Sequence, residues 1–193
     1  AFMSLGQNLI TGYTGMLSLC GAGFFAIGSY TTAILVTKCG WSFWLTLPVA
    51  AILCALMGVL IGLPTLRLKG DYLAIATLGF AEIVRNIINN WDSLTNGPMG
   101  IQRIPIITLF GIKISPYNKY VFLLLEIVLL LICYFLLERL ASSRMGRALE
   151  AIREDEIATS SLGINVTKYK VVSFALGAAV TGIAGSLQAE FVL

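Results

Sequence analysis

Charged side chains that can bind a partner are concentrated in one stretch of this sequence, residues 138 to 156. The whole chain contains no histidine, the commonest general base and metal ligand. Mixed charge without histidine favours a surface that binds a soluble partner over bond-breaking chemistry. The stretch holds four arginines (Arg139, Arg144, Arg147, Arg153) and five acids (Glu138, Glu150, Glu154, Asp155, Glu156).

Motifs for catalysis, metal binding and nucleotide binding are absent from the sequence. Without histidine no Ser/His or Cys/His nucleophile pair can form, and no GxxxxGK[ST] phosphate loop occurs. The four cysteines, at positions 20, 39, 54 and 133, lack metal-ligand spacing, so we expect buried free thiols. The net charge of +3 is small and spread over loops. We therefore expect no catalytic residue, no metal, no cofactor and no nucleic-acid partner.

The composition places the chain among membrane proteins. Residues are 58% hydrophobic and 12% charged, whereas a soluble domain averages about 25% charged. Uncharged or nearly uncharged runs long enough to cross a bilayer cover residues 1–37, 43–63, 120–137 and 171–189. Asp71 is expected to cap a further, less apolar helix over 72–91, and Pro64 to end the helix before it. We expect an all-α fold, a polytopic transmembrane helical bundle with broken helices, truncated at both ends.

The first run is too long for one straight helix. At 1.5 Å per residue it would extend about 55 Å, against a hydrocarbon core of about 30 Å. The expected break is at Gly12, Tyr13 and Gly15. Irregular backbone at membrane depth is tolerated where it lines a cavity, and glycine-interrupted segments indicate a transport site. The alternative is that these glycines only allow close helix packing.

Three charged residues fall inside expected spanning helices. Glu82 and Arg85 are one helical turn apart and can pair, and we expect them to face the bundle interior or its rim. They either neutralise each other or belong to a gate or permeation path. Glu126 is alone in its run, so it should pair with another helix or stay protonated.

Residues 142–163 form a polar segment between two spanning helices, and their pattern predicts two short helices. Ser143 can cap the first, whose apolar stripe is Met145, Leu149 and Ile152. Asp155 can cap the second, residues 156–162, with Gly163 in the left-handed conformation that ends it. Such an element offers a docking surface to a soluble partner. The alternative is an ordinary solvated loop.

The distribution of basic residues predicts which side this segment occupies. Eight lie on its side of the membrane and four on the other, which puts residues 142–163 in the cytoplasm and the loop 92–117 outside. The first group is Arg67, Lys69, Arg139, Arg144, Arg147, Arg153, Lys168 and Lys170; the second is Lys38, Arg103, Lys113 and Lys119.

Three motifs carry a resemblance to a known family: NLITGYTG at 8–15, RLKGDYLAIATLG at 67–79, and GRALEAIREDEIA at 146–158 followed by LGIN at 162–165. Together they resemble the LivM-type permease subunit of bacterial branched-chain amino acid ABC importers. The resemblance implies one transmembrane permease domain over 1–193, with 142–163 as its cytoplasmic coupling loop. It also implies a second permease subunit, two ATP-binding subunits, a periplasmic or extracellular substrate-binding protein and location in the bacterial inner membrane among membrane lipid.

The resemblance also implies roles for individual residues. The residues that couple to the ATPase would be Gly146, Arg147, Glu150, Ala151, Ile152, Arg153, Asp155 and Ala158. A translocation pathway would include Tyr13, Ser18 and Thr77, together with Gly12 and Gly15 of the break and the charged residues Glu82 and Glu126.

Three alternatives to a branched-chain amino acid permease remain open. Urea and short-chain amide ABC importers share these motifs, and substrate choice lies in the binding protein. An ion-coupled carrier or channel acting alone would use Glu126 as its ion site. A purely structural membrane scaffold would transport nothing.

Overall fold

The computed structural model describes residues 1–65, 68, 70–101, 107–109, 112–114 and 119–191. Arg67, Lys69 and Arg103, which enter the predicted sidedness, lie outside the described residues, as does part of the predicted external loop 92–117. The described elements are α1 (Phe2–Gln7), the π-helix η1 (Asn8–Gly12), α2 (Gly21–Cys39), α3 (Phe43–Thr65), α4 (Asp71–Asn90), α5 (Asp92–Thr95), the 3₁₀-helix η2 (Gly97–Met99), β1 (Ile107–Leu109), β2 (Ile112–Ile114), α6 (Lys119–Ala141), α7 (Arg144–Glu154), α8 (Glu156–Ser161) and α9 (Val166–Phe191).

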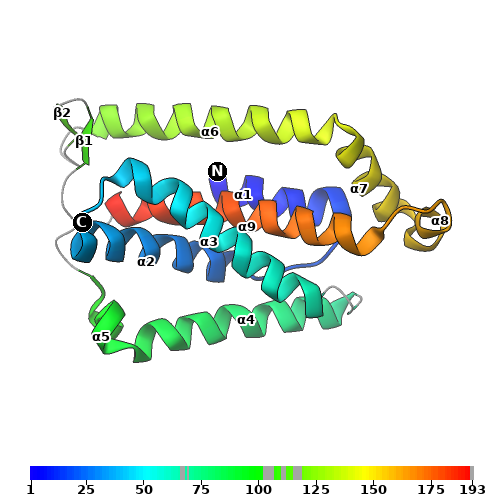
Figure 1. Ribbon diagram of the computed structural model, residues 1–193, viewed down its shortest axis with the longest axis horizontal. Helices are drawn as coiled ribbons and strands as arrows, with labels where there is room; N and C mark the ends of the chain where they lie inside the picture. The colour runs from blue at the N-terminus through cyan, green and yellow to red at the C-terminus, as the bar shows by residue number, and fades with distance from the viewer. Residues whose placement is uncertain (66–67, 69, 102–106, 110–111, 115–118, 192–193) are drawn as a thin grey trace.

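The predicted all-α bundle is confirmed. In the described residues the only strands are β1 and β2, a short antiparallel hairpin with Leu109 opposite Ile112. The five long helices α2, α3, α4, α6 and α9 run along the long axis of the molecule (Figure 1). Within the described part of the chain, four helical segments are long and apolar enough to cross a membrane: Gly21–Cys39, Phe43–Thr65, Tyr120–Ala141 and Val166–Ala189. α4 is as long but amphipathic, and it is not among them.

Helix α9 lies at the centre of the bundle, packed on α2 and α3 through small residues. A Cβ built on Gly185 would overlap the carbonyl oxygen of Phe25 in α2, and one on Gly182 would lie 2.5 Å from Sγ of Cys54 in α3. Only glycine allows the backbones to approach this closely. The predicted tight packing of this helix is therefore confirmed. Phe24 and Phe174, both fully buried, meet edge to face at 5.9 Å in the core between α2 and α9.

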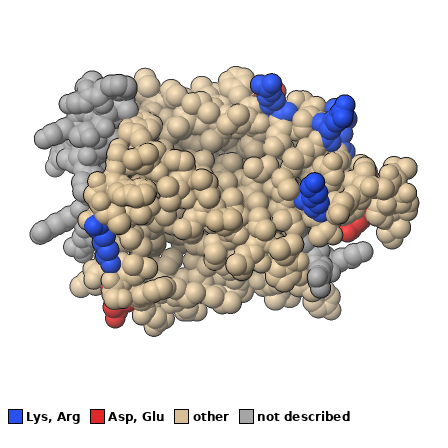
Figure 2. Space-filling view, in the orientation of Figure 1, with Lys and Arg blue, Asp and Glu red and all other residues tan. Residues whose placement is uncertain are grey.

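The two ends of the bundle carry different elements. α7 and α8 project from one end, while α5, the hairpin and the described C-terminal end of α9 lie at the other (Figure 1). On the face shown in Figure 2, most charged side chains lie toward the two ends of the long axis, and most of the surface between them carries none. This distribution is typical of a protein whose middle lies in a bilayer.

The local signals in residues 142–163 are confirmed. The Ser143 hydroxyl accepts a hydrogen bond from the Met145 amide at 3.1 Å and caps α7. The Asp155 carboxylate accepts from Ile157 N at 2.8 Å and Ala158 N at 3.0 Å and caps α8. Gly163 has a φ of 82°, in the left-handed region.

Two helix boundaries differ from prediction. Gly70, with a φ of 57°, is the N-cap of α4, and Asp71 is the first residue inside it. An acid in the first turn still interacts favourably with the helix dipole. Pro64 does not end α3, which continues to Thr65, because a proline near the last turn removes few helical hydrogen bonds.

Candidate transport site and coupling segment

The first membrane segment is broken where the sequence predicted. α1 passes into the π-helix η1, which ends at Gly12, and Gly15 follows with a φ of 68°. Residues 15–20 are not helical, and α2 begins at Gly21. A π-helical turn is rare and often marks a functional site in a longer helix.

Polar side chains satisfy the backbone of this interrupted segment. The Leu19 amide donates to the Thr77 hydroxyl of α4 at 2.9 Å, and the Ser173 hydroxyl of α9 donates to the Leu9 carbonyl at 3.0 Å. Gln7 Nε2 donates to the Ser18 carbonyl and, at 2.9 Å, to the Thr11 hydroxyl. Because non-helical backbone in a membrane protein needs such partners, these side chains hold the break in one conformation.

A cavity of about 980 Å³ lies beside the break, and α1, η1, the segment 17–19, the start of α2 and Ala74 form its walls. Its polar lining residues are Ser4, Gln7, Asn8, Thr11 and Ser18, and Met3, Leu17 and Leu19 are apolar. Among the described residues no charged side chain lines it. Leu17 and Leu19 are about half exposed, at 51% and 55%, so the cavity opens on the surface of the chain. Amide and hydroxyl groups beside apolar surface suit a small polar solute with an aliphatic part.

The residues assigned to the pathway occupy different places. Gly12 and Ser18 line this cavity, and Thr77 is fully buried behind it. Gly15 lines a second cavity, of about 270 Å³, together with Arg153. Tyr13, just after η1, is half-buried.

Glu82 and Arg85 pair as predicted but do not face the interior. The distance from Arg85 Nη1 to Glu82 Oε2 is 3.6 Å, and the two side chains are 71% and 56% exposed, respectively. Within the described chain the pair therefore lies outside the packed interior, and its place at the bundle interior or its rim stays a prediction for the assembled protein. The reason is that α4 turns the opposite face, with Leu73, Thr77 and Val84, toward the bundle.

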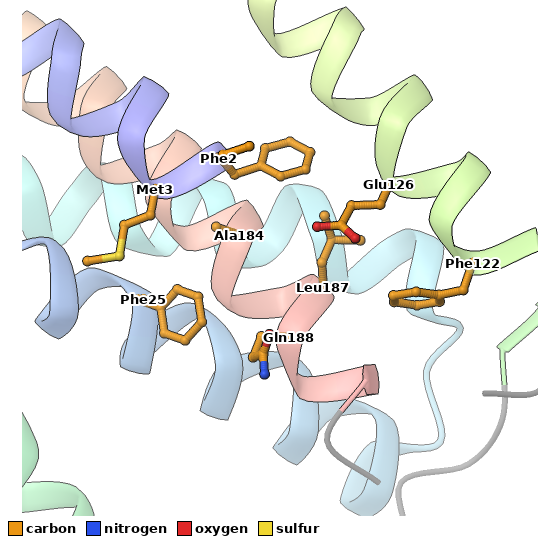
Figure 3. Close-up of a pocket in the computed structure, with 9 residues that line it drawn as sticks. Phe2, Met3, Phe25, Phe122, Glu126, Ala184, Leu187 and Gln188 are labelled. Atoms are coloured by element: carbon orange, nitrogen blue, oxygen red, sulfur yellow. The ribbon is translucent and has the colours of Figure 1, made fainter. Parts of the chain in front are cut away.

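Glu126 lies apart from the 980 Å³ cavity. It projects from α6 into a smaller pocket, of about 240 Å³, between α6 and the rest of the bundle (Figure 3). Phe2, Phe25 and Leu187 also line this pocket. The carboxylate is therefore positioned between helices rather than at the broken segment.

The residues that the family resemblance assigns to contact with the ATPase fall into a buried group and an exposed group. Gly146 and Ile152 are buried within the chain, and Ala151 is half-buried. A Cβ on Gly146 would overlap the carbonyl oxygen of Ala141, so glycine is required where α7 leaves α6. The exposed members are Arg147, Glu150, Arg153, Asp155 and Ala158.

Two apolar residues of the same segment escaped the sequence analysis. Ile157 is 73% exposed on α8, and Leu162 just after it is 80% exposed. Both lie in a polar segment, and neither belongs to the apolar stripe of α7. A large apolar side chain outside that stripe was the signal by which the sequence could have indicated them. Large apolar side chains exposed at the end of the bundle are typical of a protein contact.

Two contacts tie the projecting segment to the bundle. Arg153 Nη1 of α7 donates to the Gly12 carbonyl of η1 at 2.7 Å. Lys170 Nζ of α9 lies 2.8 Å from Glu156 Oε2 of α8. The segment is therefore joined to the broken helix itself as well as to α9.

Comparison with known proteins relates the chain to transport permeases. The family described as branched-chain amino acid transport system / permease component matches residues 1–192. The chain is 43% identical to the high-affinity branched-chain amino acid transport system permease protein LivM of Salmonella typhimurium and 42% identical to that of Escherichia coli, in both cases over 97% of this chain and 49% of the relative. It is 27% identical to a probable branched-chain amino acid transport permease protein LivH of Methanocaldococcus jannaschii, over 96% of this chain and 60% of the relative. The chain thus spans about half the length of the LivM relatives. No solved structure matches it.

Proposed function

This chain belongs to the branched-chain amino acid transport system permease family, and we propose that its protein is the permease subunit of an ABC importer. It is a multi-pass membrane protein. The solute is a branched-chain or other hydrophobic amino acid, moved into the cell across the bacterial inner membrane. ATP hydrolysis in partner subunits drives the movement, and this chain itself catalyses no reaction.

The cavity beside the broken helix is the observation that carries this proposal. Its hydroxyl and amide groups match the polar α-groups of an amino acid, and Met3, Leu17 and Leu19 match an aliphatic side chain. A lining without charged side chains suits a zwitterionic solute, because the solute must be released again after it binds. The half-exposed Leu17 and Leu19 support a contact of the second permease subunit with this side of the cavity.

The segment 142–163 is the proposed cytoplasmic docking surface for the two ATP-binding subunits. Arg147, Glu150 and Asp155 supply exposed charge there, and Ile157 and Leu162 supply apolar anchors. Buried apolar anchors with a charged rim are the usual composition of a protein interface. Gly146 and Ile152 contribute by packing α7. The opposite end, with α5 and the described strands β1 and β2 (Figure 1), is external and faces the substrate-binding protein.

Reconstitution of the complete importer tests the proposal. The full-length protein is placed in proteoliposomes with the second permease and both ATP-binding subunits, and uptake of labelled leucine is measured with the binding protein outside and ATP inside. We expect uptake that requires both ATP and the binding protein. Urea uptake in place of leucine would identify an amide importer. Uptake without ATP, lost in Glu126→Gln, would identify an ion-coupled carrier.

A single substitution tests the proposed docking surface separately. Ile157→Asp places a charge at an exposed apolar position and should abolish co-purification of the ATP-binding subunits, because a charge would be buried unpaired in the contact. Trp91→Asp is the matched control, since Trp91 is 51% exposed and caps α5, which lies at the other end of the bundle (Figure 1). Normal co-purification of the Ile157→Asp protein would contradict the assignment.

A further inference from the structure

Arg153 lies in the last turn of α7 and reaches Gly12, the last residue of η1. Its Nη1 donates to the Gly12 carbonyl at 2.7 Å, and the two residues are 141 positions apart. Because residues 15–20 are not helical, the helix offers this carbonyl no N–H one turn ahead. The guanidinium takes that place, and a charged donor makes a stronger hydrogen bond than a neutral one.

The stem of Arg153 makes a second contact with the same turn. A Cβ built on Gly15 would lie 3.2 Å from Cγ of Arg153, so the aliphatic part of the arginine lies against the backbone of Gly15. The φ of Gly15 is 68°, a conformation that side chains disfavour. Arg153 therefore holds both sides of the turn that ends the broken helix.

α7 and α8 are joined firmly enough to move together. Leu149 and Ile152 of α7 are buried, with exposed fractions of 0% and 4%. The Thr159 hydroxyl of α8 donates to the Ala151 carbonyl of α7 at 2.9 Å. A displacement applied at the exposed surface of α8 will therefore reach the end of α7, where Arg153 lies.

We propose that Arg153 is the positioning residue that transmits displacement of α7 to the wall of the 980 Å³ cavity. The inference rests on the proposed function, in which ATP-binding subunits move α7 and α8. Gly12 accepts the hydrogen bond from Arg153 and also lines the cavity. One residue therefore connects α7 to the cavity wall. When α7 moves, the π-helical turn is pulled with it and access to the cavity changes.

This role differs from the direct contact with the ATPase that the family resemblance implies for Arg153. A docking residue, when removed, loses the ATP-binding subunits. A transmitting residue keeps them and their ATP hydrolysis but loses the response of the cavity. The two roles therefore separate in one experiment.

The experiment uses the full-length protein in the complete complex, in a Cys39→Ser background, because Cys39 is exposed, contrary to the expected burial, and the three other cysteines of this sequence are buried. Thr11→Cys places a thiol in the cavity wall, and its reaction with a maleimide is measured with and without ATP.

For Arg153→Gln we expect normal assembly and ATP hydrolysis, with an ATP-dependent change in reactivity reduced about tenfold, the effect of losing one charged hydrogen bond. Arg153→Lys, which keeps a charged donor, should restore part of it. Arg144→Gln removes the same charge from the exposed first position of α7 and should leave the response unchanged.

Three results would overturn the proposal: an unchanged ATP response in Arg153→Gln, no ATP response in the parent protein, or loss of the ATP-binding subunits from the Arg153→Gln complex. Leucine uptake by the parent complex is measured in parallel. If the ATP response depends on Arg153 but leucine is not transported, the link stands and the proposed substrate fails.

Discussion

Lys170 and Glu156 form an ion pair that joins α9 to the first turn of α8, with a Nζ–Oε2 distance of 2.8 Å. The Lys170 side chain is only 11% exposed, whereas the Glu156 side chain is 38% exposed. A buried ammonium group is stable only with a partner. The pair therefore joins α8 to α9 close to Arg153, which lines the same small cavity.

We predict that Glu156→Ala loosens α8, because it leaves the Lys170 ammonium without its carboxylate. The expected loss of stability is about 1–3 kcal/mol, the cost of an unsatisfied buried group. Thermal unfolding and protease cleavage within 142–163 measure it in detergent. Lys170→Met combined with Glu156→Ala should be less harmful than the sum of the two single changes. Glu154→Ala, at an exposed neighbouring acid, is the control, and equal stability of both alanine variants would contradict the prediction.

Gly146→Ala should disrupt the junction of α6 and α7. The new methyl group would overlap the Ala141 carbonyl oxygen, and backbone cannot move aside as a side chain can. We expect destabilisation of about 1–3 kcal/mol from overpacking and loss of ATPase binding. Gly79→Ala is a matched control, since nothing lies within 4 Å of a Cβ at Gly79 in α4. That variant should gain up to about 1 kcal/mol from helix propensity. The prediction fails if the two variants have the same melting temperature.

The capping residues were predictable because their signals are local. Ser143 and Asp155 bond to amides two or three positions away, and Gly163 adopts a left-handed conformation within a single turn. Such patterns depend on few neighbours. The break in the first membrane segment was predictable from length alone, because one straight helix would exceed the bilayer.

The remaining features depend on packing between distant segments. The partner of Arg153 is 141 positions away, and no pattern in either motif indicates it. Glu82 and Arg85 were expected at the bundle interior or its rim, and the face that α4 turns inward is set by its packing on the bundle, which the sequence does not indicate. The roles of Gln7 and Ser173 follow from the carbonyl groups that the break exposes, which sequence periodicity does not locate.

Asp155 allows its capping role to be separated from its charge. Asp155→Asn keeps a side-chain oxygen for the amides of Ile157 and Ala158, so we expect stability close to that of the parent protein. Asp155→Ala removes the cap and should cost about 1 kcal/mol. If the carboxylate also contacts the ATPase, both variants lower ATPase stimulation equally. Thermal unfolding and ATP hydrolysis of the assembled complex distinguish these cases, and greater unfolding of the asparagine variant would contradict the capping role.

Thr77 tests whether the broken segment must be held for the cavity to exist. The side chain is fully buried, and its hydroxyl accepts from the Leu19 amide at 2.9 Å. Thr77→Val keeps the shape but leaves that amide unsatisfied, which should cost about 1–3 kcal/mol.

Thr77→Ser keeps the hydroxyl and loses only a methyl group, so its cost should be about 1 kcal/mol from lost burial. We expect leucine uptake to fall at least about tenfold in Thr77→Val and to remain near the parent rate in Thr77→Ser, because the segment 17–19 that lines the cavity is released only in the first. Uptake assays with protein matched for folded fraction measure the difference. Equal uptake in the two variants would contradict the role of this hydrogen bond, and loss of uptake in Thr77→Ser alone would show that the methyl group positions this segment.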